Sequence, residues 1–372
     1  MRPYFEKMQD WGKPAKENKA NAEEIKKVEQ EIAGLVEKAK NAGISKETLN
    51  KRGEWTVHQR LEYIIDPGTW TPLHTLYDPM DEESGTTGVV DGLGRINGRW
   101  CVVIGFDNKV MAGAWVAGQP HNILRVTDIA KRLHCPLVWL VNCSGVKLPE
   151  QERMYADRRG SGITFFRHAE LNKLGIPVLA AIYGTNPAGG GYQGISPTLL
   201  LAHKDCNIAV GGAGIVSGMA PKGYFDEQMA EQIIEATRKF KSVPPGRVEI
   251  HYDHTGFFKQ VFQTEEAILV AVKEWVTYLP AYNHYKFFRV AEPAEPKFPA
   301  EDLYSIVAFN QKMTYDVEQV MARLSDNSEH MEFRPGYGPE LYTGLIKVDG
   351  FLMGIVANRQ GMLPKGYPEY AP

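Results

Sequence analysis

Apolar residues near the N-terminus recur every three or four positions, which is the spacing of one helical stripe. Lys and Glu occupy most of the positions between them. We predict a surface helix over residues 20–41, packed on its own domain or on a second copy. The stripe consists of Ile25, Val28, Ile32, Leu35, Val36 and Ala39.

A second helix is predicted to begin at Thr56. Its hydroxyl can accept a bond from the backbone of the first turn, while Gln59 returns a bond to Thr56. The helical pattern ends at Asp66, where Pro67 and Gly68 follow. Downstream of this point the apolar spacing changes to that of strands.

Two distant segments have the pattern of a β-hairpin. Asn97–Gly98 and Asp349–Gly350 each separate two apolar runs, and both dipeptides accept positive φ angles readily. The two segments align at one offset, which places Gly92 on Gly344. Upstream, IIDPGTW parallels LSDNSEH with a small slip. The sequence therefore predicts a duplicated domain, although two common turns can also resemble each other by chance.

Strands and helices alternate after the first hairpin, which predicts an α/β layered unit with functional groups at the strand ends. The expected elements are a helix over 128–133, a strand over 136–142, a helix over 165–174, a strand over 176–184 and a strand over 207–214. The second copy stops soon after its hairpin, so we expect its domain to be incomplete. The predicted domains are an N-terminal helical extension (1–44), a first domain (45–285) and the start of a second (286–372), with a Pro-rich junction before the last.

Composition narrows the class of protein. The chain has 372 residues, of which 43% are hydrophobic, and this is enough for two ordinary cores. A formal net charge of −3 provides no basic excess, so we expect no nucleic-acid partner.

The cysteine pattern and the apolar runs bear on the expected location. The four cysteines form no C-x-x-C pair and lie in or beside apolar runs, which favours reduced, buried thiols and a cytoplasmic location. We find neither an apolar signal core nor a run of about 18 apolar residues, so membrane association is expected only through a partner.

The stretch GTNPAGGGYQGISP contains a G-x-G-x-x-G pattern at residues 189–194. A dinucleotide site would need an acidic residue on the next strand, and NIAVGGAG has none. A phosphate-binding P-loop would need a following Gly-Lys-Ser/Thr, which is also missing. The glycines are then either a tight connection or a place where free backbone N–H groups meet negative charge, together with the loop over 142–147.

Several segments together resemble one protein family. VNCSGVKLPEQER and GTNPAGGGYQGISP are similar to the two active-site loops of biotin-dependent acyl-CoA carboxyltransferases, in the crotonase-like superfamily. TVHQRLEYIIDPGTW and GPELYTGLIKVDGFLMGIVAN resemble the starts of the two domains in that family. The resemblance runs from about residue 45 to the end, and it implies duplicated crotonase-like domains of the ββα spiral type.

Within the family, GKPAKENKAN, LNKRGEWT and GYGPE most resemble carboxyltransferase subunits of sodium-pumping decarboxylases. This resemblance implies transfer of CO2 from glutaconyl-CoA to biotin, with crotonyl-CoA as product and no metal. It also implies a biotin-carrier subunit, a membrane-embedded sodium-pump subunit, a homo-oligomer, and a position at the inner face of the cell membrane. The biotin side of the site is expected outside this chain.

Other functions remain open. The chain can be the β subunit of an acyl-CoA carboxylase of the propionyl- or methylcrotonyl-CoA type, or a subunit that binds acyl-CoA without chemistry. A crotonase-type hydratase is disfavoured, because neither NCSGVK nor AGGGYQG supplies the carboxylates that such a reaction needs.

The resemblance assigns roles to particular residues. We predict that the backbone N–H groups of Val146 and Gly190 donate hydrogen bonds to the thioester oxygen as negative charge develops on it. The residues expected around the thioester are Ser144, Gly145, Ala188, Gly189, Gly191 and Tyr192. Arg159 is expected either to bind the substrate carboxylate or to be half of a solvated basic pair with its neighbour. The histidines are expected to have packing or surface roles, and His203, near Asp205, most merits inspection.

Overall fold

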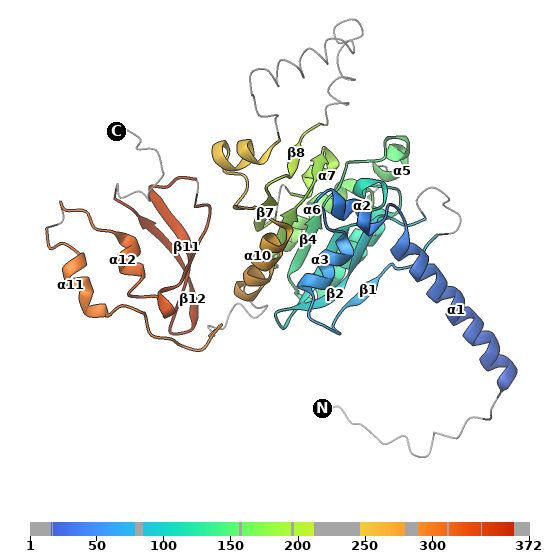
Figure 1. Cartoon of the computed structure of the whole chain (residues 1–372), viewed down its shortest axis with the longest axis horizontal. Helices are drawn as coiled ribbons and strands as arrows, with labels where there is room; N and C mark the ends of the chain where they lie inside the picture. The colour runs from blue at the N-terminus through green and yellow to red at the C-terminus, as the bar shows by residue number, and fades with distance from the viewer. Residues whose placement is uncertain are drawn as a thin grey trace, which may run out of the picture. The chain divides into compact units, whose positions relative to one another are not determined.

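The computed structural model describes residues 16, 18–78, 85–155, 158–194, 197–211, 246–279, 289–310, 312–335 and 337–360 (Figure 1). Two compact units divide the chain: Met1–Ala42 with Thr75–Thr86, and Gly43–His74 with Thr87–Pro372. The predicted boundary between residues 285 and 286 lies outside the described residues, and so do the last residues, 212–214, of the strand predicted over 207–214. The predicted domain limits therefore stay predictions.

The first unit contains the predicted N-terminal helix. Helix α1 spans Lys19–Asn41, and the Asn18 side chain caps it by accepting a bond from the backbone N–H of Asn21. None of its residues is buried. The C-terminal end of α1 is tied within the unit to Tyr77, whose N–H donates to the Leu35 carbonyl and whose ring lies 4.0 Å from Lys38 Nζ.

A seven-stranded sheet organises the second unit, in the order β1-β2-β3-β4-β5-β7-β9. The first three strands pair antiparallel and the rest pair parallel. The strands are β1 (Thr71–Leu73), β2 (Val89–Ile96), β3 (Arg99–Phe106), β4 (Leu137–Val141), β5 (Val178–Ile182), β7 (Leu199–His203) and β9 (Gln260–Phe262). A separate parallel pair is formed by β6 (Thr185–Pro187) and β8 (Asn207–Ala209).

Both faces of this sheet are buried. Along β3, Val102 and Ile104 belong to one hydrophobic cluster, whereas Cys101 and Val103 belong to the other. Helices α4 (Gln119–Leu133) and α6 (Ser161–Lys173) contribute to the first cluster. Helices α3 (Val57–Ile64) and α10 (Glu265–Tyr278) contribute to the second. The central strands are therefore continuous apolar runs, as is typical of sheets covered on both faces.

Short helical elements connect the layers. They are α2 (Lys46–Lys51), η2 (Met111–Gly113), η3 (Leu148–Glu150), α5 (Gln151–Tyr155), α7 (Gly189–Tyr192), the π-helix η4 (Glu249–His254), η5 (Ala300–Asp302), α11 (Leu303–Ile306), α12 (Val317–Met321) and η6 (Asp326–Ser328). None of the helices in the described part of the chain is both long and apolar enough to cross a membrane.

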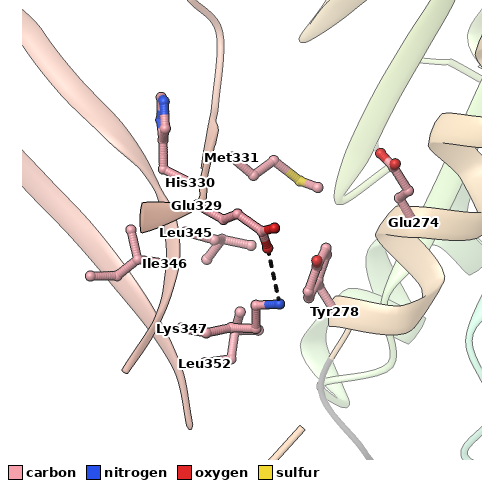
Figure 2. A pocket seen from close by; sticks show the side chains of 9 residues that line it. All are labelled: Glu274, Tyr278, Glu329, His330, Met331, Leu345, Ile346, Lys347 and Leu352. Atoms are coloured by element: carbon pink, nitrogen blue, oxygen red, sulfur yellow. Dashed lines mark ion pairs between the residues drawn. The ribbon is translucent and has the colours of Figure 1, made fainter. Parts of the chain in front are cut away.

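The C-terminal region forms a second, smaller sheet. Strands β10 (His330–Glu332), β11 (Leu341–Val348) and β12 (Phe351–Asn358) pair antiparallel. Residues of this sheet and of α10 line a small pocket, in which Lys347 Nζ lies 3.5 Å from the Glu329 carboxylate (Figure 2).

Both predicted hairpins are confirmed, with the same two-residue turn. In the first turn φ is 49° at Asn97 and 78° at Gly98. In the second turn φ is 51° at Asp349 and 76° at Gly350. The capping box at Thr56 is also confirmed, since Gln59 and Thr56 exchange both bonds. All four cysteines are free and buried.

Several boundaries differ from the prediction. Helix α4 begins at Gln119, well before residue 128, because Gly118 and Pro120 start a helix efficiently. Helix α6 begins at Ser161 rather than at residue 165. Strand β7 and helix α10 were not predicted, and β8 pairs with β6 outside the main sheet.

Candidate active site

Two loops leave the main sheet side by side. The last residues of β4 and β5, Val141 and Ile182, are register partners in a parallel ladder. The segments that follow them, 142–147 and 183–192, therefore start at the same edge of the sheet. They pack against each other, since a Cβ on Gly145 would lie 3.3 Å from Pro187 Cγ.

The backbone around Val146 pairs with Trp115. Trp115 bridges to Val146 in parallel fashion, donating to the Gly145 carbonyl at 2.7 Å and accepting from the Lys147 N–H at 2.9 Å. In such a pairing the middle residue turns its own N–H away from the partner strand. Within the described ranges, the Val146 N–H has no hydrogen-bond partner.

The N–H group of Gly190 lies in the first turn of α7, where backbone donors have no partner inside the helix. The Ala188 carbonyl accepts bonds from Gly191 at 2.9 Å and from Tyr192 at 3.0 Å. Considering only described residues, the Gly190 N–H donates no hydrogen bond.

The glycines of α7 are required by protein packing. A Cβ on Gly190 would lie 2.3 Å from the carbonyl oxygen of Cys143, and one on Gly191 would lie 2.7 Å from the carbonyl oxygen of Asn186. Gly190 therefore lets the two loops approach each other, and Gly191 allows close packing within the second loop.

Ala188, just before α7, has an unusual backbone conformation. Its φ of 45° and ψ of −123° are favourable only for glycine. The residue is held there by its N–H, which donates to the Ala209 carbonyl at 2.7 Å, and by its own carbonyl. Surrounding bonds therefore stabilise a strained residue beside the two free donors.

Aromatic side chains surround Gly189. A Cβ at this position would lie 3.3 Å from the Trp115 ring and 3.3 Å from Tyr155 Oη. Phe165 stacks edge-on with both Trp115 and Tyr192, at centroid distances of 5.4 and 5.5 Å. The sequence analysis missed Tyr155 and Trp115, because neither lies near the glycine loop in sequence.

An apolar cavity of about 590 Å³ adjoins α7. Its walls include Tyr192, Ile208 and Phe257, together with His251, whose Nε2 lies 2.9 Å from the Ile208 carbonyl. The cavity is large enough for a short hydrocarbon chain.

Comparison with known proteins assigns the fold. A sequence model of the carboxyl transferase domain matches residues 48–365. The chain belongs to the carboxyl transferase family. It is 54% identical over 369 residues to the glutaconyl-CoA decarboxylase subunit alpha of Acidaminococcus fermentans, covering 99% of this chain and 62% of that protein. It is 29% identical over 313 residues to the biotin-dependent 3-methylcrotonyl-coenzyme A carboxylase beta1 subunit of Mycobacterium tuberculosis, covering 82% and 56%.

Solved structures of carboxyl transferase relatives share the fold. The transcarboxylase 12S structure with hydrolysed methylmalonyl-coenzyme A matches with a TM-score of 0.72 at 23% identity, over 90% of this chain and 62% of that one. A single-chain long-chain acyl-CoA carboxylase matches with a TM-score of 0.69 at 20% identity, over 93% and 33%. The predicted class of duplicated crotonase-like α/β domains is thereby confirmed. The chain spans less than two thirds of the length of these relatives.

The remaining predicted site residues of this carboxyl transferase chain lie around the same loops, with one exception. Ser144 donates through Oγ to the Met111 carbonyl at 3.0 Å. Arg159 lies exposed in the turn between α5 and α6. Burial raises the pKa of the Cys143 thiol to about 12, so this residue of the first loop stays uncharged.

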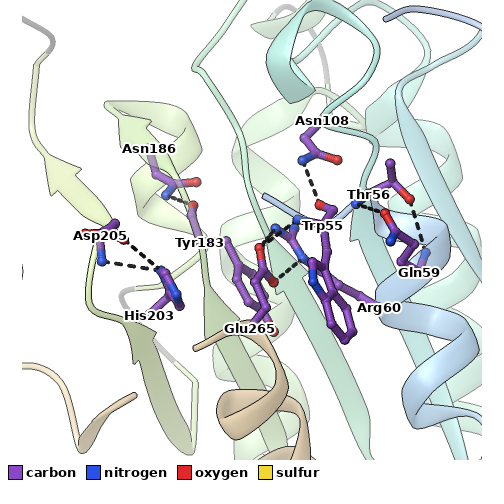
Figure 3. Close-up of polar contacts among 10 residues, drawn as sticks. All are labelled: Trp55, Thr56, Gln59, Arg60, Asn108, Tyr183, Asn186, His203, Asp205 and Glu265. Carbon is purple, nitrogen blue, oxygen red and sulfur yellow. Dashed lines mark hydrogen bonds and ion pairs between the residues drawn. The ribbon is translucent and has the colours of Figure 1, made fainter. Parts of the chain in front are cut away.

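A second, polar cavity of about 610 Å³ lies at the ends of β3, β4, β5 and β7. Its wall contains a buried ion pair in which Arg60 donates to Glu265 through Nε at 2.9 Å and Nη2 at 2.7 Å (Figure 3). His203 also lines it, with Nδ1 3.9 Å from the Asp205 carboxylate. Across the described residues, no group of three or more His, Cys, Asp or Glu side chains could hold a metal ion.

Proposed function

We propose that this protein transfers CO2 from glutaconyl-CoA to biotin carried by a partner subunit, leaving crotonyl-CoA. The observation that carries the proposal is a pair of N–H groups, on Val146 and Gly190, that make no hydrogen bond among the described residues and lie in two loops that pack against each other at one edge of the sheet. The 54% identity to the glutaconyl-CoA decarboxylase subunit alpha supports the choice of substrate.

The proposed reaction requires hydrogen-bond donors at the thioester oxygen, and the two loops can supply them. When the bond to the carboxylate carbon breaks, its electron pair moves through the double bond onto the thioester oxygen, giving a dienolate. Donors that already point at this oxygen stabilise the charge without reorganising, and one such donor is worth about 3–4 kcal/mol in the transition state. The bond cleavage takes no proton from carbon, so this step needs no general base.

Biotin supplies the nitrogen that accepts CO2, and its displaced proton balances the proton gained by the dienolate carbon. The chain's own residues hold the thioester. Gly145, Ala188 and Gly189 form the backbone around the two donors, and Ser144 and Gly191 fix the loops that carry them. Tyr192 and the apolar cavity beside it receive the hydrocarbon chain.

Arg159 is proposed to bind the free carboxylate of the substrate before cleavage. A guanidinium group matches a carboxylate with two parallel hydrogen bonds, and an exposed arginine on the turn after α5 can reorient to meet it.

We propose that the protein acts as part of a complex. A biotin-carrier subunit, a membrane-embedded sodium-pump subunit and further copies of this chain are its proposed partners. The protein itself would then be held at the cytoplasmic face of the membrane by those partners.

The test is an assay, with glutaconyl-CoA and biotin, of this chain together with the biotin side of the site that is expected outside it, following crotonyl-CoA. We expect turnover that depends on both substrates. A second candidate, an acyl-CoA carboxylase β subunit, is favoured by the 29% identity to the 3-methylcrotonyl-coenzyme A enzyme. Turnover of carboxybiotin with 3-methylcrotonyl-CoA or propionyl-CoA, and none with glutaconyl-CoA, would replace our proposal by that one. Binding of acyl-CoA without any turnover would indicate a non-catalytic subunit.

A further inference from the structure

Asn186 joins the two loops of the candidate site. Its side chain is fully buried, at 0% exposure, in the middle of β6. Oδ1 accepts a hydrogen bond of 2.7 Å from the backbone N–H of Cys143, which lies on the first loop. Nδ2 donates to the Tyr183 carbonyl at 2.7 Å (Figure 3) and to the Gly184 carbonyl at 3.2 Å, and both residues lie on the second loop.

This bond holds the first loop at a defined distance from α7. Asn186 binds the N–H of Cys143. The carbonyl oxygen of Cys143 lies so close to Gly190 that a Cβ added to Gly190 would be 2.3 Å from this oxygen. Val146 follows three residues later on the same loop. Asn186 therefore links the two loops directly, while the backbone bonds of Trp115 to Gly145 and Lys147 hold the far end of the first loop.

Tyr183, whose carbonyl accepts a hydrogen bond from Asn186, is itself held by packing. The Tyr183 ring packs against the buried Arg60 guanidinium, whose carbon lies 3.7 Å from the ring centroid. Glu265 holds that guanidinium with two hydrogen bonds (Figure 3). An amide suits this place between the loops, because it offers one acceptor for the N–H on one side and donors for the carbonyls on the other.

We propose that Asn186 is a positioning residue that sets the spacing between the N–H groups of Val146 and Gly190. The proposal rests on the function proposed above. Asn186 does not touch the substrate, so its loss should leave acyl-CoA binding largely intact. Displacing a reacting group by about 1 Å costs on the order of a hundredfold in rate.

The experiment compares Asn186→Ala and Asn186→Ser with the unchanged protein. Crotonyl-CoA carrying a 13C-labelled thioester carbonyl is bound, and the carbonyl stretching frequency is read by infrared difference spectroscopy. Two converging donors should lower this frequency in the unchanged protein. In both variants we expect a smaller shift, a Kd for crotonyl-CoA within about threefold, and a kcat about a hundredfold lower with KM nearly unchanged.

Asn108→Ala is the matched control. Asn108 is similarly buried and its amide donates to the Trp55 carbonyl at 3.0 Å (Figure 3), and among the described residues it makes no hydrogen bond to either loop. We expect this variant to keep the full carbonyl shift and kcat.

The outcomes separate the two proposals. If the unchanged protein binds crotonyl-CoA with no carbonyl shift, the proposed donor pair is wrong. If it shows the shift and the Asn186 variants keep it, the donors stand and the positioning role is overturned. If the variants fail to fold, hydrogen exchange of the Cys143 amide in the unchanged protein decides: exchange as fast as that of an exposed loop amide refutes the role, and strong protection supports it.

Discussion

Asp326 accepts a 2.7 Å hydrogen bond from the backbone N–H of Gly350, and Asp66 accepts one of the same length from Gly98. Each aspartate also accepts from the first residue of the turn, Asp349 at 2.9 Å or Asn97 at 3.1 Å. An equivalent aspartate thus holds the same kind of two-residue turn in both hairpins. This equivalence places Asp66 on Asp326, as the alignment of IIDPGTW with LSDNSEH predicted.

Removing either aspartate should destabilise its own hairpin. We expect Asp326→Ala and Asp66→Ala each to lower the free energy of unfolding by about 2–3 kcal/mol, because backbone donors lose a charged acceptor. Asp302→Ala, which removes a half-exposed partner of Arg323, should cost under about 1 kcal/mol. Urea unfolding followed by circular dichroism measures all three. Equal effects of the three variants would contradict the bracing role.

Gly190→Ala should damage both stability and activity. The new methyl group would lie 2.3 Å from the Cys143 carbonyl, so the two loops must separate. We expect a loss of about 1–3 kcal/mol in stability and a loss of on the order of a hundredfold in kcat. Gly162→Ala in α6, where no atom lies within 4 Å, should instead be neutral or stabilising by up to about 1 kcal/mol. Normal turnover by Gly190→Ala would show that the loop spacing is unimportant.

His168 should make the protein sensitive to acid. Its ring is fully buried against Trp139, and burial lowers its pKa from 6.5 to about 4. Both ring nitrogens lack hydrogen-bond partners in the described part of the chain. Because the unfolded state binds the proton first, this contribution to stability is complete above pH 6.5 and is lost as the pH falls toward 4.

The variant His168→Phe isolates this effect. Relative to it, the unchanged protein should lose about 3 kcal/mol of stability between pH 6.5 and pH 4. Thermal unfolding at half-unit pH steps gives the difference between the two proteins. Parallel curves over this range would mean that His168 does not stay neutral.

Removing one partner of the Arg60–Glu265 pair should lower the stability of the protein strongly, whereas replacing both partners by apolar side chains should lower it little. Glu265→Gln leaves a buried guanidinium without its counter-charge, and we expect a loss of about 3–5 kcal/mol. The double variant Arg60→Met/Glu265→Leu should recover most of this loss, because apolar side chains need no compensating charge. Urea unfolding midpoints test the pair. A double variant less stable than Glu265→Gln would contradict this account.

Arg159→Ala should affect only substrates with a free carboxylate. We expect kcat/KM for glutaconyl-CoA to fall about 10- to 100-fold, the range of one charged hydrogen bond, while the Kd of crotonyl-CoA stays the same. Arg132→Ala, at an exposed position in the last turn of α4, is the control and should change neither. A full preference for the dicarboxylic substrate in Arg159→Ala would remove this residue from the site.

The sequence by itself determined the local features. The capping box at Thr56, the two turns at Asn97–Gly98 and Asp349–Gly350, and strands β4 and β5 depend on residues a few positions apart. Their hydrogen bonds and backbone angles are set by neighbouring side chains, so a single sequence is sufficient to predict them.

The tertiary structure decided how distant segments meet. The unpredicted strand β7 takes the place in the main sheet next to β5, and β8 is directed to β6. Glu265 reaches Arg60 across 205 residues, and Asn186 reaches Cys143 across 43. These bonds form only because folding closes long loops around a common core, and the energy that repays this closure comes from burial of both sheet faces. No local sequence pattern predicts a partner so far away along the chain. The glycine loop could therefore be predicted from the sequence, whereas the bond from Asn186 to Cys143 could not.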